Sequence, residues 1–339
     1  MDKIQIANIL LTRRCNLRCD YCSIVRDYEG MPTEYPSMKY HKDHELDVTV
    51  WIEIIERLRK NNPDVFLIFY GGEPFLYSGL TELINYCHEK DIYYTIISNN
   101  TEEIQPRILQ LWRDVGTIRG FSASVDPSLY NALMDLHPSK DHAVWKTLVG
   151  YKNLRELKKN KIADDVVAEI TITHDNCIHL YDTVKILSEA DIYSSITTID
   201  LKKSNYYDFS TITDKSLLVQ PDSFIAKQFM DIMADESLKV HIPQMLIKLY
   251  NILPCEMKCK IYEDVNNVTI DSDGSFRLCL RIRGTISPAA SLNNVINEDG
   301  NVTGFFKDTL KRDYDSYCKG CNHTCLLMSK YYSQGIVIH

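Results

Sequence analysis

The sequence predicts an α/β protein, a partial (β/α)6 barrel followed by a smaller, cysteine-rich α+β extension at the C-terminus. Two observations lead to this fold class. Apolar runs typical of buried strands alternate with amphipathic helical patterns as far as about residue 203. Beyond that point the regularity fades, and six of the 11 cysteines lie there. We therefore expect a barrel over residues 1–210 and an extension over residues 211–339.

Each expected element has its own local signal. Strands are expected at residues 4–11, 65–70, 92–98, 120–125, 166–173 and 194–199, and helices at 51–60, 80–90, 101–115, 139–159 and 177–190. Asp47 and Thr101 are expected to cap helices, and Gly116 to end one. Such alternation implies parallel strands, whose C-terminal ends carry the active site.

The expected extension begins with a linker over residues 204–222. Helices are expected at residues 224–234 and 243–253. Two short strands, 265–270 and 275–280, flank Asp273-Gly274, a dipeptide typical of β-hairpins.

Composition excludes several classes of protein. Hydrophobic residues make up 45% of the chain, charged residues 25%, and the formal net charge is -8. This charge gives no long-range attraction for nucleic acid or anionic lipid. No apolar run approaches the roughly 18 residues of a membrane span, and no secretory signal is visible. We expect a cytoplasmic protein that contacts neither nucleic acid nor membrane.

The sharpest motif follows the first expected strand. Residues 13–22, here termed the cysteine loop, read RRCNLRCDYC and place Cys15, Cys19 and Cys22 close together. Three thiolates at this spacing can hold one face of a [4Fe–4S] cluster and leave one iron open. The alternative is a zinc site completed by His41 or His44, although zinc more often takes tight CxxC pairs.

The spacing C-x3-C-x2-C, with the aromatic Tyr21 before the last cysteine, resembles the signature of the radical S-adenosylmethionine (SAM) superfamily. The resemblance implies catalysis on Cys15, Cys19 and Cys22, with the open iron binding SAM. Reductive cleavage of SAM to a 5′-deoxyadenosyl radical and hydrogen abstraction from a substrate would follow. It also implies an electron donor such as flavodoxin or ferredoxin.

Two further motifs end the second and third expected strands. Gly71, Gly72 and Glu73 resemble the family's GGEP element, which binds the amino group of SAM. Ser98 and Asn99 resemble a family pair that contacts ribose. A Gly-Gly turn alone is usually only a turn, and residues 99–101 also suit a turn and helix cap.

Polar residues also mark the fourth and fifth expected strands. Ser124 and Asp126 resemble the family's S-x-D element beside SAM, although Pro127 stands where many peptide-modifying members have glycine. Glu169 is expected to point into the barrel together with Thr171, either as polar filling or as a cofactor contact.

The C-terminal cysteines resemble the SPASM and twitch extensions of the same superfamily, which bind auxiliary [4Fe–4S] clusters. Cys259, Gly274 and Cys279 give C-x14-G-x4-C, but the tail carries fewer cysteines than a full SPASM tail. One auxiliary cluster is expected on Cys259, Cys279, Cys318 and Cys321, with Cys255 and Cys325 as substitutes or as ligands of a second cluster. A zinc ribbon formed by 255, 259, 318 and 321 is the alternative.

Three functions are compatible with these motifs. The first is an oxidoreductase-type radical SAM enzyme that oxidises, cross-links or epimerises a peptide or protein side chain. The second applies the same chemistry to a small molecule, such as an amino sugar or cofactor precursor. The third is a zinc-binding interaction protein without catalysis. Cys87 and Cys177 lie in apolar helical patterns and are expected to be small buried hydrophobes.

Overall fold

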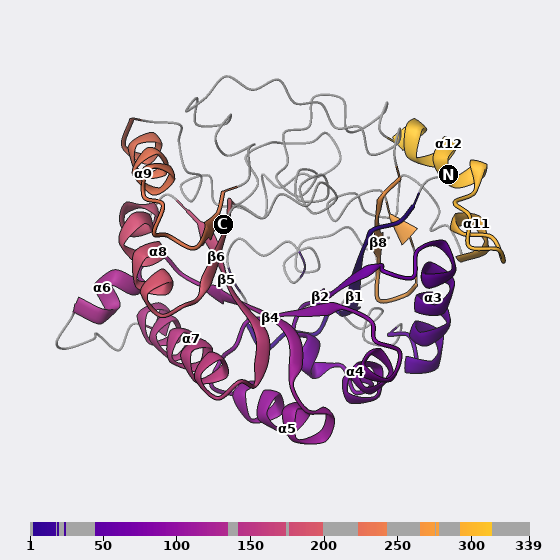
Figure 1. The fold of residues 1–339 in the computed structure, drawn as a ribbon, viewed down its shortest axis with the longest axis horizontal. Helices are drawn as coiled ribbons and strands as arrows, with labels where there is room; N and C mark the ends of the chain where they lie inside the picture. The colour runs from indigo at the N-terminus through magenta and orange to yellow at the C-terminus, as the bar shows by residue number, and fades with distance from the viewer. Residues whose placement is uncertain are drawn as a thin grey trace, which may run out of the picture.

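Eight parallel strands build an open, partial barrel (Figure 1). The computed structural model describes residues 3–17, 19, 24, 45–134, 142–173, 176–198, 223–242, 265–274, 276–277 and 292–313. The sheet order is β7-β6-β5-β4-β3-β2-β1-β8-β9, and only β9 runs antiparallel. The strands are β1 (Ile6–Thr12), β2 (Phe66–Gly71), β3 (Tyr94–Ser98), β4 (Ile118–Val125), β5 (Ala163–Ile172), β6 (Tyr193–Thr198), β7 (Val240–His241), β8 (Asn267–Ile270) and β9 (Phe276–Arg277). The predicted α/β fold class is confirmed.

Helices cover the outer face of this sheet (Figure 1). They are α3 (Val48–Asn61), α4 (Leu80–Glu89), α5 (Gln105–Val115), α6 (Leu129–Met134), α7 (His142–Lys159), α8 (Leu180–Glu189), α9 (Ser223–Ala234), α11 (Leu292–Val295) and α12 (Gly304–Asp313), with 3-10 turns at Pro74–Leu76 and Cys177–His179. None of these described helices is long and apolar enough to cross a bilayer.

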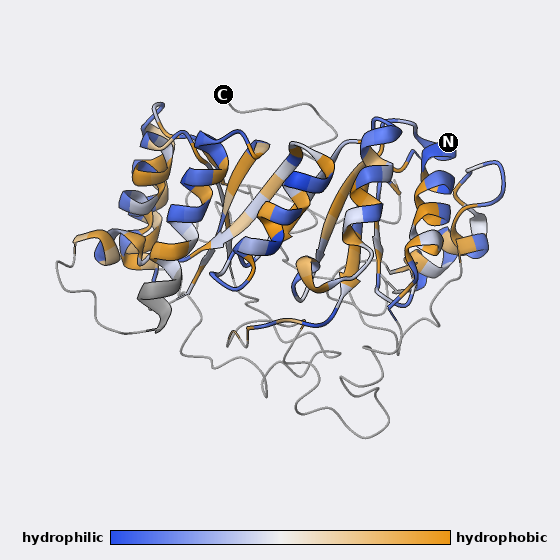
Figure 2. Cartoon of the chain, turned by 90° about the horizontal axis from the view of Figure 1, so that it is seen from below, coloured by the Kyte–Doolittle hydropathy of each residue, from blue (hydrophilic) through white to orange (hydrophobic). Residues whose placement is uncertain are grey.

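Helix α3 shows how the local sequence determines these elements. The Asp47 side chain accepts a hydrogen bond from the Thr49 N–H and caps the helix, as predicted. Apolar residues at helical spacing bury one face against the sheet: Trp51, Ile54, Ile55 and Leu58. Figure 2 shows the same division, with hydrophilic and hydrophobic residues alternating around the helices.

The core lies between the helices and the outer face of the sheet. Along β5, Val166, Ala168 and Ile170 are buried in it, whereas Val167 and Glu169 are only half-buried on the opposite, inner face. Cys87 and Cys177 are buried members of this core, which confirms their predicted role as small hydrophobes.

Two expectations need correction. Thr101 does not cap a helix through its side chain, because α5 begins at Gln105 and only the Thr101 carbonyl accepts the N–H groups of Ile104 and Gln105. The turn of residues 101–104 thus delays the helix. The predicted hairpin around Gly274 is present as β8 and β9, but β8 also pairs in parallel with β1. This part of the expected extension therefore belongs to the main sheet.

Candidate functional site

Cys15 lies just beyond the C-terminal end of β1, where the fold requires an active-site residue. Its sulfur accepts the Leu17 N–H at 3.3 Å and an N–H of the Asn99 amide at 3.7 Å. Hydrogen bonds of this kind favour the thiolate, the form that binds a metal. Cys19, four residues further along the chain, is half-buried. Tyr21, Cys22 and all the C-terminal cysteine positions from 255 onward lie outside the described residues.

The two glycines at the end of β2, Gly71 and Gly72, pack directly against the end of β1 and the start of the cysteine loop. The Gly72 N–H donates to the Thr12 carbonyl and the Glu73 N–H to the Arg14 carbonyl, each at 2.8 Å. A Cβ on Gly72 would lie 2.2 Å from the Arg14 oxygen, and one on Gly71 2.2 Å from the Thr12 oxygen. Only glycine permits so close an approach of the two chains. We term this close backbone contact the Gly72 cradle, and it holds the loop after β2 against the chain beside Cys15.

The Glu73 carboxylate is fully buried. It accepts hydrogen bonds from Ser98 Oγ at 3.0 Å, from the Asn99 N–H at 2.9 Å and from the Phe75 N–H at 3.2 Å. Burial raises the pKa of Glu73 to about 7, against the lowering effect of these donors. In this structure Glu73 therefore joins the ends of β2 and β3, and its contact with a ligand ammonium group stays a prediction.

The loop after β3 completes the link to the cysteines. The Asn99 amide donates to Asn16 Oδ1 at 2.7 Å, and the Asn16 amide donates to Thr101 Oγ1 and Glu103 Oε2, each at 3.0 Å. Three strand-end loops, those after β1, β2 and β3, thus meet around Cys15. The structure brings together the predicted residues Cys15, Gly71, Gly72, Glu73, Ser98 and Asn99.

Ser124 and Asp126 lie at the end of β4. Ser124 is exposed on the inner face of the sheet. Asp126 accepts the Ser128 N–H at 2.8 Å and the Asn176 amide at 2.9 Å. These bonds join the ends of β4 and β5 and orient the Asp126 carboxylate. A shared role of this pair with the cysteines remains a prediction.

A row of polar side chains crosses the inner face. Strand register aligns Ser124, Glu169, Ser195 and His241 on β4, β5, β6 and β7, and we term this the polar row. Burial raises the pKa of Glu169 to about 7, although the hydroxyls of Ser195 and Ser122 lower it. Burial also lowers the pKa of His241. Glu169 points inward with Thr171, as predicted.

Stability should depend on pH through Glu73. Its raised pKa means that the unfolded chain ionises near pH 4.5 while the folded chain keeps the proton to about pH 7. The contribution is complete below pH 4.5 and is lost as the pH rises to about 7, by roughly 3 kcal/mol. Urea unfolding of the metal-free chain should show this fall, and Glu169 adds to it in the same sense.

Glu73→Gln should flatten this pH dependence, because glutamine resembles the protonated carboxyl and cannot ionise. Glu82→Gln, on the exposed Glu82 of α4, is the matched control and should leave it unchanged. An equally steep pH dependence in Glu73→Gln would contradict the assignment.

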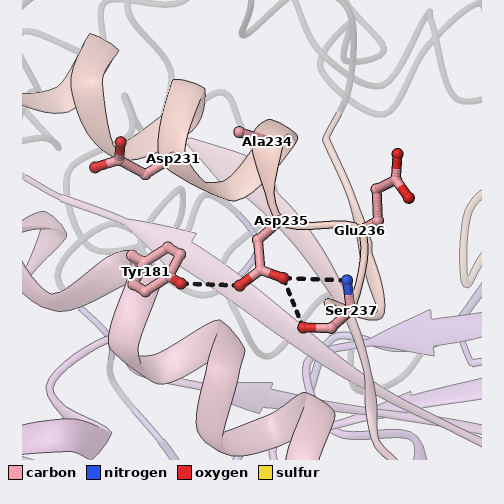
Figure 3. A pocket seen from close by; sticks show the side chains of 6 residues that line it. All are labelled: Tyr181, Asp231, Ala234, Asp235, Glu236 and Ser237. Carbon is pink, nitrogen blue, oxygen red and sulfur yellow. Dashed lines mark hydrogen bonds between the residues drawn. The ribbon is translucent and has the colours of Figure 1, made fainter.

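A separate pocket lies among α8, α9 and the turn that follows α9 (Figure 3). Its lining includes Asp231, Asp235 and Glu236, and Asp235 accepts hydrogen bonds from the Tyr181 hydroxyl and from Ser237. It contains none of the predicted site residues. Because Asp235 is bonded to Tyr181 and Ser237, and Asp231 to Lys227, we assign this pocket no function.

Three residues of this site were not anticipated from the sequence. Asn16 bridges the cysteine loop to the loop after β3, Asn176 orients Asp126, and Ser195 faces Glu169. The position of Asn16 between two cysteines could have indicated this role, because residues beside metal ligands often orient those ligands through hydrogen bonds. Asn176 and Ser195 carry no local signal, because their partners are brought near only by the sheet.

Comparison with known sequences agrees with this arrangement. The profile of the radical SAM superfamily matches residues 9–187, which is more than half of the chain. A curated S-adenosylmethionine-dependent nucleotide dehydratase of Selenomonas ruminantium is 26% identical over 130 residues, covering 37% of this chain and 42% of that protein. An uncharacterized protein of Methanocaldococcus jannaschii is 29% identical over 195 residues, covering 55% of this chain and 59% of that protein. The chain thus spans about half the length of these curated relatives.

The fold is also similar to that of a solved structure. SuiB of Streptococcus suis superposes with a TM-score of 0.62 over 91% of this chain and 68% of SuiB, at 12% identity. SuiB has been solved bound to S-adenosylmethionine and to its precursor peptide SuiA. At this identity the likeness establishes the fold alone.

Proposed function

The chain belongs to the radical SAM superfamily, and from this premise we propose that it is an enzyme that abstracts hydrogen from a peptide or protein side chain. Cys15, Cys19 and Cys22 would hold the [4Fe–4S] cluster. When bound, the cluster and SAM supply a 5′-deoxyadenosyl radical, which takes a hydrogen atom from the substrate. An electron donor such as flavodoxin or ferredoxin would supply the electron.

The meeting of three strand-end loops around Cys15 carries this proposal. Gly71 and Gly72 bring the backbone after β2 against the cysteine loop, and Asn99 donates to the Cys15 sulfur. Strand-end loops fixed to one another in this way would hold the cluster ligands in one position beside a bound amino acid moiety. Ser124 and Asp126, at the next strand end, would orient the remainder of SAM.

The polar row would face the substrate. Glu169 has hydroxyl neighbours but no cationic partner among the described residues, and its pKa near 7 suits a group that exchanges a proton at neutral pH. We propose that Glu169 holds or moves a proton on the substrate while the radical reacts with a C–H bond. Positioning that bond and excluding water would be the protein's share of catalysis.

The C-terminal region, 211–339, is proposed to bind one auxiliary cluster on Cys259, Cys279, Cys318 and Cys321, with Cys255 and Cys325 as substitutes. The hairpin of β8 and β9 around Gly274 supports the resemblance to a twitch extension. An auxiliary cluster would allow a net oxidation by accepting an electron from the substrate. The zinc ribbon remains the alternative for these positions.

The peptide substrate and a small-molecule substrate are each favoured by one comparison. Similarity of fold to SuiB, which has been solved with a precursor peptide, favours the peptide. Sequence similarity to a nucleotide dehydratase favours a nucleotide or related small molecule. A zinc-binding protein without catalysis is not favoured, because the superfamily match begins within β1, contains the whole cysteine loop and continues past β5.

Anaerobic assay tests the proposed function. The purified chain is reconstituted with iron and sulfide, reduced with dithionite and supplied with SAM, and 5′-deoxyadenosine is measured by chromatography. Perdeuterated peptides and deuterated nucleotides are then offered separately. Deuterium in the 5′-deoxyadenosine from the peptides supports the proposal, and deuterium from the nucleotides supports the alternative. Failure to form any 5′-deoxyadenosine in iron-loaded protein would contradict both.

A further inference from the structure

The turn that follows β8, residues 271–274, lies at the same edge of the sheet as the cysteine loop. This follows from the parallel pairing of β8 with β1 over Ile6–Ile9, which brings the C-terminal ends of both strands together. We term residues 271–274 the β8 turn. Although it comes from a distant part of the sequence, it contacts the chain both before and after the three cysteines.

The first contact precedes the cysteines. The Arg13 guanidinium forms a two-pronged pair with Asp271, in which Nε lies 3.0 Å from Oδ1 and Nη2 also contacts Oδ2. Both side chains are only 3% exposed. The Ser272 N–H donates to the same Oδ1 at 2.7 Å. Only Arg14 separates Arg13 from Cys15, so this pair fixes the point at which the cysteine loop leaves β1.

The second contact follows the cysteines. The Leu46 N–H donates to the Ser272 carbonyl at 3.0 Å, and the Leu46 carbonyl accepts the Tyr77 hydroxyl at 2.8 Å. Gly274, at a φ of 80°, lies so close to Leu46 that an added Cβ would be 2.9 Å from Leu46 Cδ1. The β8 turn therefore also fixes the point at which the chain returns to α3.

The two flanks are joined to each other as well. Glu45 accepts hydrogen bonds from Arg14 Nε and Nη2, each at 2.7 Å, and from the Thr12 hydroxyl. The β8 turn and Glu45 together close the base of the segment that carries Cys15, Cys19 and Cys22. Main-chain pairing over Ile6–Ile9 already attaches β8 to the sheet, so the buried Arg13–Asp271 pair is not needed for attachment alone.

We propose that the β8 turn is a positioning element for the three-cysteine site, with Asp271 as its central positioning residue. By holding Arg13 and Leu46, it sets the position of Cys15 relative to Asn99 and the Gly72 cradle. This inference rests on the proposed function, in that the cysteines are taken to hold the cluster. It also couples the C-terminal region to the radical SAM site through protein contacts that need no auxiliary cluster.

Asp271→Asn is the direct test, made in the full-length chain. It leaves the Arg13 charge buried beside a neutral amide. In the reconstituted protein we expect iron retention against a chelator to weaken roughly 10-fold to 100-fold. We also expect the electron paramagnetic resonance spectrum of the reduced cluster to lose its change on addition of SAM. Gly274→Ala places a Cβ against Leu46 at a φ of 80°, which alanine rarely adopts, and keeps the Arg13–Asp271 pair; it should move both readouts in the same direction by less.

A readout that needs no cluster accompanies this test. Hydrogen exchange of the metal-free chain reports the amides of Gly72 and Glu73, which donate to Thr12 and Arg14. Asp271→Asn should speed their exchange roughly 10-fold or more, since local opening of the loop base exposes them. Leu187→Ala is the matched control, because it removes buried side chain from α8 and lowers global stability far from the loop.

The outcomes separate the two hypotheses. Faster exchange and weaker iron retention in Asp271→Asn, beyond those of Leu187→Ala, support the positioning role. Exchange equal to that of the control overturns it, whatever the iron content. If the wild-type chain holds no cluster, the proposed function fails, and the exchange comparison still decides whether the β8 turn fixes the loop.

Discussion

Replacing Cys15, Cys19 and Cys22 together with alanine should abolish formation of 5′-deoxyadenosine, by roughly a thousandfold or more. The proposed [4Fe–4S] cluster needs thiolate ligands. Once all three cysteines are replaced, the cysteine loop has no thiolate left to bind it. The variant should also lose about four irons per chain after anaerobic reconstitution. Iron and sulfide counting, with chromatography of the reaction mixture, measures both effects.

Two controls make this result specific. Alanine at Cys279, Cys318 and Cys321 should remove only iron bound by the C-terminal region, and SAM cleavage should persist. Alanine at the buried core residue Cys87 should cost stability but no iron. Full iron content and undiminished SAM cleavage in the triple N-terminal variant would place the active cluster elsewhere in the chain.

Local patterns in the sequence predicted the barrel and the strand ends at which the candidate site lies. The strands β1 to β6 were predicted from apolar or β-rich runs, and each motif follows such a run directly. The two-residue strand β7 has no such run and was not predicted. Because parallel strands bring their C-terminal ends to one edge, the expectation that Cys15, Gly72 and Ser98 lie together required only the strand boundaries. The contacts of Gly72 with Arg14 and of Ser98 with Glu73 agree with it.

The pairing of β8 with β1 could not be predicted in the same way. Local periodicity identifies a strand but not its neighbour, and a hairpin typically starts a separate small sheet. The pairing of Arg13 with Asp271 has no local signal either. In the sequence each residue looks like an ordinary surface charge, although both side chains are buried. What links them is a non-local pairing that appears only once the whole sheet is assembled.

The Thr101 cap failed for a different reason. Thr101 has the right residue type for a helix cap, but its hydroxyl accepts the Asn16 amide of the cysteine loop. Local capping and a long-range contact compete for one hydroxyl, and the helix begins later, at Gln105. A departure from local rules here coincides with the candidate site, as expected where the site constrains the chain.

Gly72→Ala should have a large effect for the addition of a single methyl group. The new Cβ would lie 2.2 Å from the Arg14 oxygen and 2.8 Å from the Arg13 oxygen, both backbone atoms that cannot turn away. The loops after β1 and β2 must move apart, which breaks the 2.8 Å hydrogen bonds from the Gly72 N–H to Thr12 and from the Glu73 N–H to Arg14. We expect a loss of at least about 1–3 kcal/mol in the free energy of unfolding and roughly 10-fold to 100-fold weaker iron retention.

Gly304→Ala provides the matched comparison, because no atom lies within 4 Å of its added Cβ. It makes the same chemical change at the start of α12 and should leave unfolding and iron retention near wild type. Urea unfolding of the metal-free chain separates the packing cost from the effect on the cluster. If Gly72→Ala unfolds and retains iron as Gly304→Ala does, the loops after β1 and β2 are not held together as described. The candidate site would then lack the close backbone contact on which its geometry depends.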